Sequence, residues 1–265
     1  MAVLIAMFQR GLLYLLLLQL GLMSLLWNLC AWLLYPLMPR RAGTALGRAA
    51  ISRVYRIFWA STELLGMLQV DAAALEMLGE EPGGLIIAAN HPTMLDALLL
   101  IARLRRGVCI MKADLMRNPF LAAGARLARY IRNDSPRGMM RCAVQCLQDG
   151  GQLVMFPEGT RTVQRPINRF RPGIAWIAQK ARVPIQTVII ETDTAYLRKG
   201  WPIWRAPAFP VRVRVRLGKR FPPGAHHAAL LEDLEGYFVR ELAPASTSAP
   251  APLSGRAEQG SPRRA

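Results

Sequence analysis

A histidine and an aspartate five residues apart stand where a short apolar run ends. Residues 85–89 are aliphatic and have the length of a buried strand, and Asn90 and His91 follow directly before a proline. His91 is therefore predicted at the carboxyl end of a strand, the edge at which ligands bind in open α/β sheets. Asp96, in a helix predicted over 93–106, is close enough to hydrogen-bond the imidazole and fix its tautomer. The pair predicts a general base, with a structural histidine beside a helix-cap carboxylate as the alternative.

A second polar block follows another short apolar strand at 153–156. Gly159 permits a tight turn, which lets Glu158 and Arg161 point into one loop together with Thr160. The planar guanidinium of Arg161 suits a phosphate monoester, and backbone N–H groups of the turn can add to it. A local salt bridge between Glu158 and Arg161 is the alternative.

Together these blocks resemble the glycerolipid acyltransferase family, the lysophospholipid acyltransferases typified by 1-acylglycerol-3-phosphate acyltransferase. The family carries an N-H-x-x-x-x-D block, matched by Asn90-His91 and Asp96, and an F-P-E-G-T-R block, matched by residues 156–161. Residues 130–132 stand where the family has an aromatic-isoleucine-arginine block, and residues 183–185 open its fourth block. The resemblance covers roughly residues 85–190 and the apolar N-terminus.

Two departures concern the acceptor. The second block lacks the usual acid before Arg132, and the fourth has Gln186-Thr187 where a second proline is common. The resemblance implies an α/β fold with a mixed central sheet flanked by helices, similar to glycerol-3-phosphate acyltransferase, after N-terminal membrane helices. It implies His91 and Asp96 as catalytic residues, and substrate binding by Arg132 and by the block Glu158, Gly159, Thr160 and Arg161.

Further basic residues are candidates for the same phosphate-bearing ligand. Arginines recur after Arg161, at Arg165, Arg169 and Arg171, and such a density of guanidinium groups suits a phosphate. Lys112, at the end of a strand predicted over 108–112, is a candidate for the acidic-ligand side of the site, with a solvated lysine as the alternative.

The amino-terminal region predicts membrane attachment. No charged residue occurs between Arg10 and Arg40, a stretch long enough to cross a hydrocarbon core of about 30 Å. Basic residues dominate after this stretch, which predicts that the catalytic domain lies on the cytoplasmic side of the inner membrane. Residues 51–70 predict an interfacial amphipathic helix. The alternative is a helical hairpin inserted into one leaflet.

Composition supports a lipid surface as partner. The chain has 34 Lys and Arg against 17 Asp and Glu, a net charge of +17, and a mean hydropathy of +0.20. Basicity combined with positive hydropathy favours an anionic membrane surface and argues against nucleic acid. The predicted organisation is membrane-anchoring helices over 1–70, an acyltransferase domain over 71–242 and a disordered basic tail over 243–265.

Three other features have less specific interpretations. Residues 211–217 alternate valine with arginine, which predicts an edge strand protected by charge or, alternatively, a surface for lipid headgroups or an acidic carrier protein. His226-His227 opens the last predicted helix, over 226–242, and is not interpreted as a metal site. Scattered cysteines indicate a reducing compartment without zinc or disulfides. No metal or organic cofactor is expected.

These observations predict direct acyl transfer. The sequence has no G-x-S-x-G elbow and no cysteine in an activating context, so no covalent acyl-enzyme is indicated. His91 is expected to deprotonate the hydroxyl of lysophosphatidic acid as it attacks an acyl thioester of acyl carrier protein or coenzyme A, giving phosphatidic acid. The alternatives are another acceptor such as a lyso-ornithine lipid or glycolipid, a hydrolase using the same pair, and a non-enzymatic membrane-bound adaptor.

Overall fold

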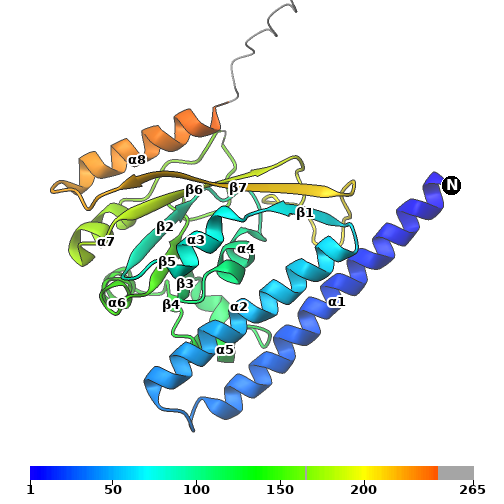
Figure 1. The fold of residues 1–265 in the computed structure, drawn as a ribbon, viewed down its shortest axis with the longest axis horizontal. Coiled ribbons are helices and arrows are strands. Elements are labelled where there is room, and N and C mark those ends of the chain that lie inside the picture. Colours follow the sequence, from blue (N-terminus) through cyan, green and yellow to red (C-terminus); the bar gives the residue numbers. More distant parts are fainter. Residues whose placement is uncertain (165, 244–265) are drawn as a thin grey trace, which may run out of the picture.

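A mixed seven-stranded sheet forms the centre of the molecule (Figure 1). The computed structural model describes residues 1–164 and 166–243. The strand order is β1-β7-β6-β2-β5-β3-β4, and every neighbouring pair is parallel except the antiparallel β6 and β7. The strands are β1 (Leu68–Asp71), β2 (Leu85–Ala89), β3 (Gly107–Met111), β4 (Ile131–Arg132), β5 (Gln152–Met155), β6 (Ile185–Thr192) and β7 (Val211–Phe221). The mixed sheet flanked by helices confirms the predicted fold class.

Helices cover both faces of this sheet. They are α1 (Ala2–Leu34), α2 (Arg40–Leu64), α3 (Ala74–Glu80), α4 (Asp96–Arg103), α5 (Ala122–Leu127), α6 (Pro136–Gln148), α7 (Gly173–Ala181) and α8 (His227–Leu242), with a 3₁₀ turn at Ala113–Arg117. In β2 all five residues are buried, and alternate residues enter the two cores, Ile87 toward α2 and α4 and Ile86 toward α6, α7 and α8. Because β2 is buried on both faces of the sheet, its sequence is a continuous run of apolar residues.

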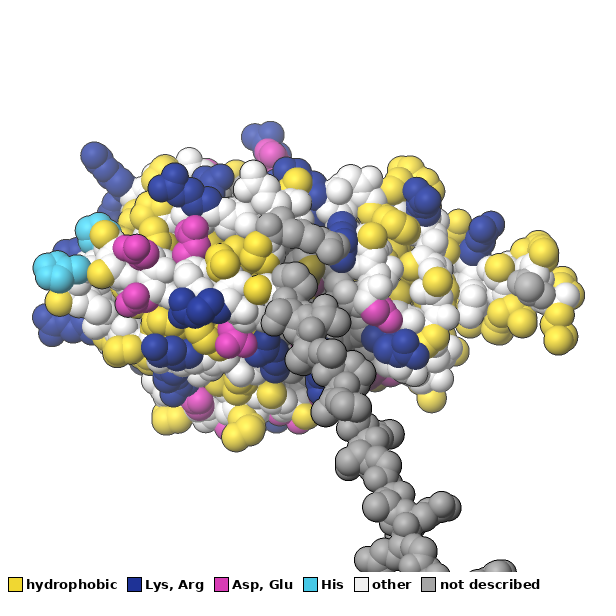
Figure 2. Space-filling model, turned by 90° about the horizontal axis from the view of Figure 1, so that it is seen from above, with side chains coloured by type: hydrophobic (Ala, Val, Ile, Leu, Met, Phe, Trp, Pro, Cys, Tyr) yellow, Lys and Arg dark blue, Asp and Glu magenta, His cyan; other side chains and the backbone are white. Residues whose placement is uncertain are grey.

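The two amino-terminal helices run antiparallel along one side of the body (Figure 1). Between Val3 and Leu34, α1 is long and apolar enough to cross a membrane. Its Leu13, Leu16 and Ala31 are nevertheless buried, while its first two turns project from the body with apolar side chains outward (Figure 2). One side of α1 thus belongs to the protein core, and the other is apolar and exposed.

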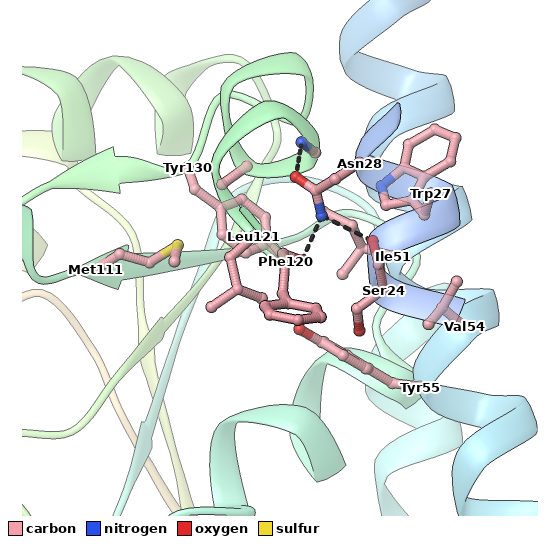
Figure 3. A pocket seen from close by; sticks show the side chains of 12 residues that line it. Ser24, Trp27, Asn28, Ile51, Val54, Tyr55, Met111, Phe120, Leu121 and Tyr130 are labelled. Carbon is pink, nitrogen blue, oxygen red and sulfur yellow. Dashed lines mark hydrogen bonds between the residues drawn. The ribbon is translucent and has the colours of Figure 1, made fainter. Parts of the chain in front are cut away.

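A cavity of about 30 Å³ lies where α1, α2 and α5 meet (Figure 3). Beside it the buried Asn28 reaches from α1 to α5: its amide nitrogen donates to the carbonyl of Phe120, and its oxygen accepts from Gly124 N at 3.0 Å. Gly124 packs so closely that an added Cβ would lie 2.6 Å from the indole nitrogen of Trp27. A polar contact therefore fixes the register of the apolar helix on the body.

The helix predicted over 51–70 was wrong in its bounds. It begins at Arg40 and ends at Leu64, and Gly66, with φ +66°, turns the chain into β1. Apolar residues of β1 made the helix seem longer because a four-residue strand carries too little alternation to be recognised. The helix predicted over 93–106 is likewise shorter, since α4 begins only at Asp96 and ends at Arg103.

The prediction that residues 211–217 form an edge strand is also wrong. Strand β7 is paired on both sides, with β6 and with β1, whose strand character was missed. The arginines of β7 contact carboxylates: Arg212 lies 3.7 Å from Asp193, Arg214 lies 3.6 Å from Asp71, and Arg216 lies 2.6 Å from Glu241. The alternating arginines of β7 therefore form ion pairs with residues of neighbouring elements. The predicted tail lies, from residue 244 onward, outside the described residues, as does Arg165.

Candidate active site

Asn90 holds the end of β2 against β6. Its side-chain nitrogen donates to the Ile190 carbonyl at 2.8 Å, and its oxygen accepts from Ile190 N at 2.7 Å. The amide thereby makes the two bonds that a backbone peptide would make to the neighbouring strand. The backbone can then leave the sheet, and His91 follows at the carboxyl edge, as predicted.

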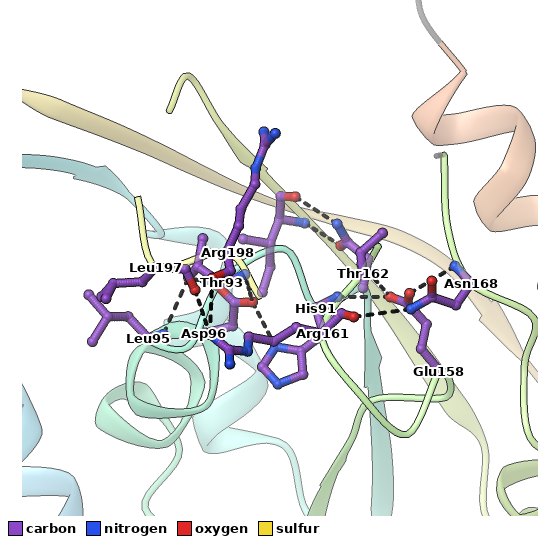
Figure 4. Close-up of polar contacts among 12 residues, drawn as sticks. His91, Thr93, Leu95, Asp96, Glu158, Arg161, Thr162, Asn168, Leu197 and Arg198 are labelled. Carbon is purple, nitrogen blue, oxygen red and sulfur yellow. Dashed lines mark hydrogen bonds and ion pairs between the residues drawn. The ribbon is translucent and has the colours of Figure 1, made fainter. Parts of the chain in front are cut away.

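His91 and Asp96 form a close pair (Figure 4). His91 Nδ1 lies 2.9 Å from Asp96 Oδ2, and the aspartate side chain is 3% exposed. Thr93 also holds this carboxylate, through its backbone N at 2.8 Å and its hydroxyl at 2.6 Å. A carboxylate that only accepts hydrogen bonds assigns the proton to Nδ1, so Nε2 carries the free lone pair.

The imidazole is also held by packing. It stacks on Phe156, with ring centroids 3.9 Å apart and planes 16° apart, and its side chain is 17% exposed. No described residue hydrogen-bonds Nε2. One nitrogen is therefore fixed by the protein and the other is available to a substrate, which is the arrangement of a general base.

Glu158 binds the loop that carries it. Its Oε1 accepts from His91 N at 3.1 Å and from the Thr162 hydroxyl at 2.7 Å, while Oε2 accepts from Asn168 N at 2.9 Å. Thr162 N returns a 2.7 Å bond to the His91 carbonyl. With the residue 3% exposed, these bonds show that Glu158 holds the loop and is not paired with Arg161, while its contact with substrate stays a prediction.

Arg161 lies over the loop that follows β6. Its Nη1 donates to the carbonyls of Leu197 at 2.9 Å and Arg198 at 3.2 Å. Its Nε and Nη2 have no hydrogen-bond partner in the described part of the chain, so three N–H groups on two nitrogens are available to an anion. The side chain is thus held by one nitrogen and offers the others.

Gly159 and Arg171 form the outer wall of the same loop. Gly159 has φ +69°, and any Cβ there would collide with the Arg171 side chain, whose own backbone N bonds the Pro157 carbonyl at 2.8 Å. Thr160 is half-buried between Gly159 and Arg161. The glycine thus lets the arginine pack against the turn, which adds a second guanidinium to this edge.

Two predicted substrate-binding residues lie farther along the sheet. Lys112 is exposed after β3, and Arg132 ends β4 in an exposed ion pair with Asp134. The strand order places both beyond β5, on the side away from β6. The contacts therefore gather His91, Asp96, Glu158 and Arg161, with Gly159, Thr160 and Arg171 on the same loop as Glu158 and Arg161. Among the described residues no hydrogen bond or ion pair joins Lys112 or Arg132 to this group, and their contact with substrate stays a prediction.

Sequence reasoning missed the residues that orient this group. Thr93, Thr162 and Asn168 bind the two carboxylates, and Phe156 supports the imidazole. Thr93 has a recognisable signal, a hydroxyl three residues before a helix-starting aspartate. Asn168 has none, because its contact depends on the path of the loop.

Buried hydroxyl and thiol groups nearby are protonated at neutral pH. Burial raises the pKa of Tyr196, which lines a cavity of about 20 Å³ with Thr93 and Asp96, to about 12. Burial likewise raises the pKa of Cys109 to about 12. Neither group is a nucleophile in these surroundings. In the described residues, no three His, Cys, Asp or Glu side chains are arranged to hold a metal ion.

Comparison with known proteins agrees with this site. The family model described as Acyltransferase matches residues 71–191, which include both polar blocks. A 1-acyl-sn-glycerol-3-phosphate acyltransferase of Pseudomonas aeruginosa is 23% identical over 201 residues, 74% of each chain. A chloroplastic one of Brassica napus is 24% identical over 137 residues, 50% of this chain but only 40% of that protein, so the match spans less than half of this relative.

A solved structure shares the fold. The crystal structure of the 1-acyl-sn-glycerophosphate acyltransferase PlsC from Thermotoga maritima superimposes with a TM-score of 0.68, covering 91% of this chain and 96% of its own at 19% identity. Because it covers 91% of this chain, the structural match extends beyond residues 71–191 to the amino-terminal helices. The match to the Acyltransferase family model, which covers just under half of the chain, and the shared fold agree with the resemblance of the two polar blocks to the lysophospholipid acyltransferase family.

Proposed function

We propose that this acyltransferase moves a fatty acyl group from a thioester to the free hydroxyl of lysophosphatidic acid, giving phosphatidic acid. The observation that carries the proposal is the connection between base and anion site: the His91 carbonyl accepts from Thr162 N, one residue after Arg161. A proton acceptor and unpaired guanidinium donors thus lie on two neighbouring loops that are joined by hydrogen bonds. An acceptor that bears both a hydroxyl and a phosphate monoester matches this pairing.

The chemistry follows from the orientation of the imidazole. Nε2 of His91 removes the hydroxyl proton as the hydroxyl oxygen attacks the thioester carbonyl, and Asp96 stabilises the imidazolium that forms. The carbon–sulfur bond then breaks, and the departing thiolate takes the proton from Nε2. Such base catalysis typically contributes about 10²–10⁴ in rate. We take the transfer to be direct, because the sequence has no G-x-S-x-G elbow and burial disfavours the thiolate form of Cys109.

The partners follow from charge and hydropathy. Acyl carrier protein and coenzyme A are both polyanionic donors that suit a chain of net charge +17. We place the protein on the cytoplasmic side of the inner membrane, held by α1 on an anionic lipid surface. Because Leu13, Leu16 and Ala31 of α1 pack on the body, a hairpin of α1 and α2 inserted into one leaflet is supported over a simple span.

Acyl transfer by detergent-purified protein tests the proposal. Labelled acyl-coenzyme A and acyl carrier protein thioesters are each offered with lysophosphatidic acid, a lyso-ornithine lipid and a lyso-glycolipid. We expect phosphatidic acid from the wild type, its loss by orders of magnitude in His91→Ala, and no loss in His226→Ala, an exposed histidine remote from the site. If only another lyso-lipid gives product, acyl transfer by His91 is supported and lysophosphatidic acid is rejected as the acceptor. Full function without His91 would favour a non-enzymatic adaptor.

Arg161→Ala tests the phosphate assignment. Removal of this guanidinium should raise the KM for lysophosphatidic acid more than that for an acceptor without phosphate, because only the former loses an ion pair. Equal losses on both acceptors would assign Arg161 to the loop that it tethers through Leu197.

A further inference from the structure

A second exposed element lies beside α1 and belongs to neither the anchor nor the catalytic pair. We infer that residues 196–205, the tryptophan loop, form a second membrane contact that holds the mouth of the site against an anionic lipid surface. The inference rests on the proposed function for its purpose, which is delivery of a lipid acceptor to His91.

The tryptophan loop connects the site to α1. At its beginning the Leu197 carbonyl accepts from Arg161 Nη1 at 2.9 Å and from Met94 N at 3.1 Å. At its end the Trp204 carbonyl accepts from the hydroxyl of Tyr14, on α1, at 3.2 Å. The loop therefore lies between the anion-binding arginine and the apolar helix, so a surface that meets α1 here also meets the loop.

The tip of the loop is apolar and exposed. The exposed fractions are 67% for Trp204 and 40% for Ile203, and next to their contact point α1 exposes Leu15 and Leu18 at 61% and 56%. This continuity joins the loop tip to the exposed face of α1 in one apolar surface. Tryptophan and tyrosine side by side at the edge of such a surface are typical of the membrane–water interface.

The charge around this tip fits anionic lipid. Residues 194–210 contain Arg198, Lys199 and Arg205 and no Asp or Glu. The Arg205 guanidinium lies over the ring of Trp201, 4.9 Å from its centroid, and Trp201 Nε1 donates to the Arg205 carbonyl at 2.8 Å. The basic side chain is thus held beside the aromatic tip. Each basic group near an anionic leaflet contributes about 1 kcal/mol, or about fivefold in binding.

Fluorescence quenching tests the contact without turnover. The wild type, Trp204→Phe and Trp176→Phe are reconstituted in phosphatidylglycerol-containing vesicles whose acyl chains are brominated near the headgroup. Trp176 lies on α7, which packs on the opposite core, and serves as the matched control. We expect Trp204→Phe to remove part of the bromine-quenched emission and Trp176→Phe to leave that part unchanged. Equal quenched emission in the wild type and Trp204→Phe overturns the inference.

Steady-state kinetics test whether the membrane contact helps to deliver the acceptor from a vesicle to the site. In the paired variant Ile203→Ser and Trp204→Ser, we expect the apparent KM for acceptor presented in vesicles to rise about tenfold, since burial of a large apolar side chain changes an equilibrium by about that factor or more. The KM for a short-chain acceptor dissolved as monomers should be unchanged. The KM for acceptor could instead rise only with the acyl carrier protein donor, while the bromine-quenched emission is equal in the wild type and Trp204→Phe. That result would assign the loop to binding the acidic carrier protein and overturn the membrane contact.

The two proposals fail in different ways. Quenching can be measured in His91→Ala, so it reports on the loop whatever the acceptor is. If lysophosphatidic acid is not a substrate while Trp204 is quenched, the proposed acceptor fails and the membrane contact stands. If lysophosphatidic acid is acylated and Trp204 is not quenched, the membrane contact alone fails.

Discussion

Replacing Glu158 by glutamine keeps the shape of the side chain and removes one of its acceptors. If the glutamine oxygen takes the place of Oε1, the bonds from His91 N and the Thr162 hydroxyl remain. An NH₂ group then faces Asn168 N across 2.9 Å, where two donors meet in a buried place. Loss of a charge-assisted bond that leaves a buried donor unpaired costs about 2–4 kcal/mol.

For a domain of this size about 1 kcal/mol lowers the unfolding temperature by about 2–4 °C, so Glu158→Gln should lower it by about 4–16 °C. Thermal unfolding in detergent measures this shift, with Glu232→Gln, an exposed glutamate of α8, as control. We expect kcat to fall, because the His91 backbone is less firmly held, with little change in the KM for acceptor. An unchanged unfolding temperature together with a raised acceptor KM would refute the reasoning and return Glu158 to substrate binding.

Four further experiments probe the molecule. Asn28→Leu leaves Gly124 N unpaired at the junction of α1 and α5, so the unfolding temperature in detergent should fall, by the equivalent of about 1–3 kcal/mol. Gly159→Ala requires φ +69° of a residue with a Cβ and displaces a neighbouring arginine, so acyl transfer should fall more steeply than stability, as parallel activity and unfolding assays will measure. At pH 8 a maleimide should label Cys142, which is exposed, and spare buried Cys109, as mass spectrometry will show. Because the pKa of Cys109 is raised from 9.0 to about 12, the unfolded chain ionises first, and the free energy of unfolding should decrease above pH 9 by up to about 1.4 kcal/mol per pH unit, measured against Cys109→Ala.

The elements with strong apolar runs were predictable. Strands β2, β3 and β5 and helix α8 were expected within a few residues of their bounds, because burial of a strand gives a short aliphatic run between turn residues and a long amphipathic helix repeats its pattern. The weaker elements were not. Strand β1 has four residues and its pairing with β7 joins positions about 140 residues apart, a contact that no local pattern reports.

The candidate site was predictable in its residues and less so in their roles. The spacing of His91 and Asp96 indicated their contact, since a helix start brings the carboxylate back toward the strand end. The role of Glu158 depended on Asn168, whose position in the loop no spacing reveals. Arg161 likewise meets carbonyls of a segment 36 residues away, so its tether could come only from the fold.

The two bonds of Asn90 to Ile190 have a mechanical consequence. They attach the start of the histidine block to β6, and the chain that leaves β6 continues to the carbonyl of Leu197 that holds Arg161. The histidine block is therefore bonded to β6 and Arg161 to the loop that follows β6, so these contacts limit the change in distance between the two side chains. Under the proposed function, a fixed separation selects acceptors by length: those whose hydroxyl and phosphate match the spacing should react, and those in which the two groups lie closer or farther apart should react poorly.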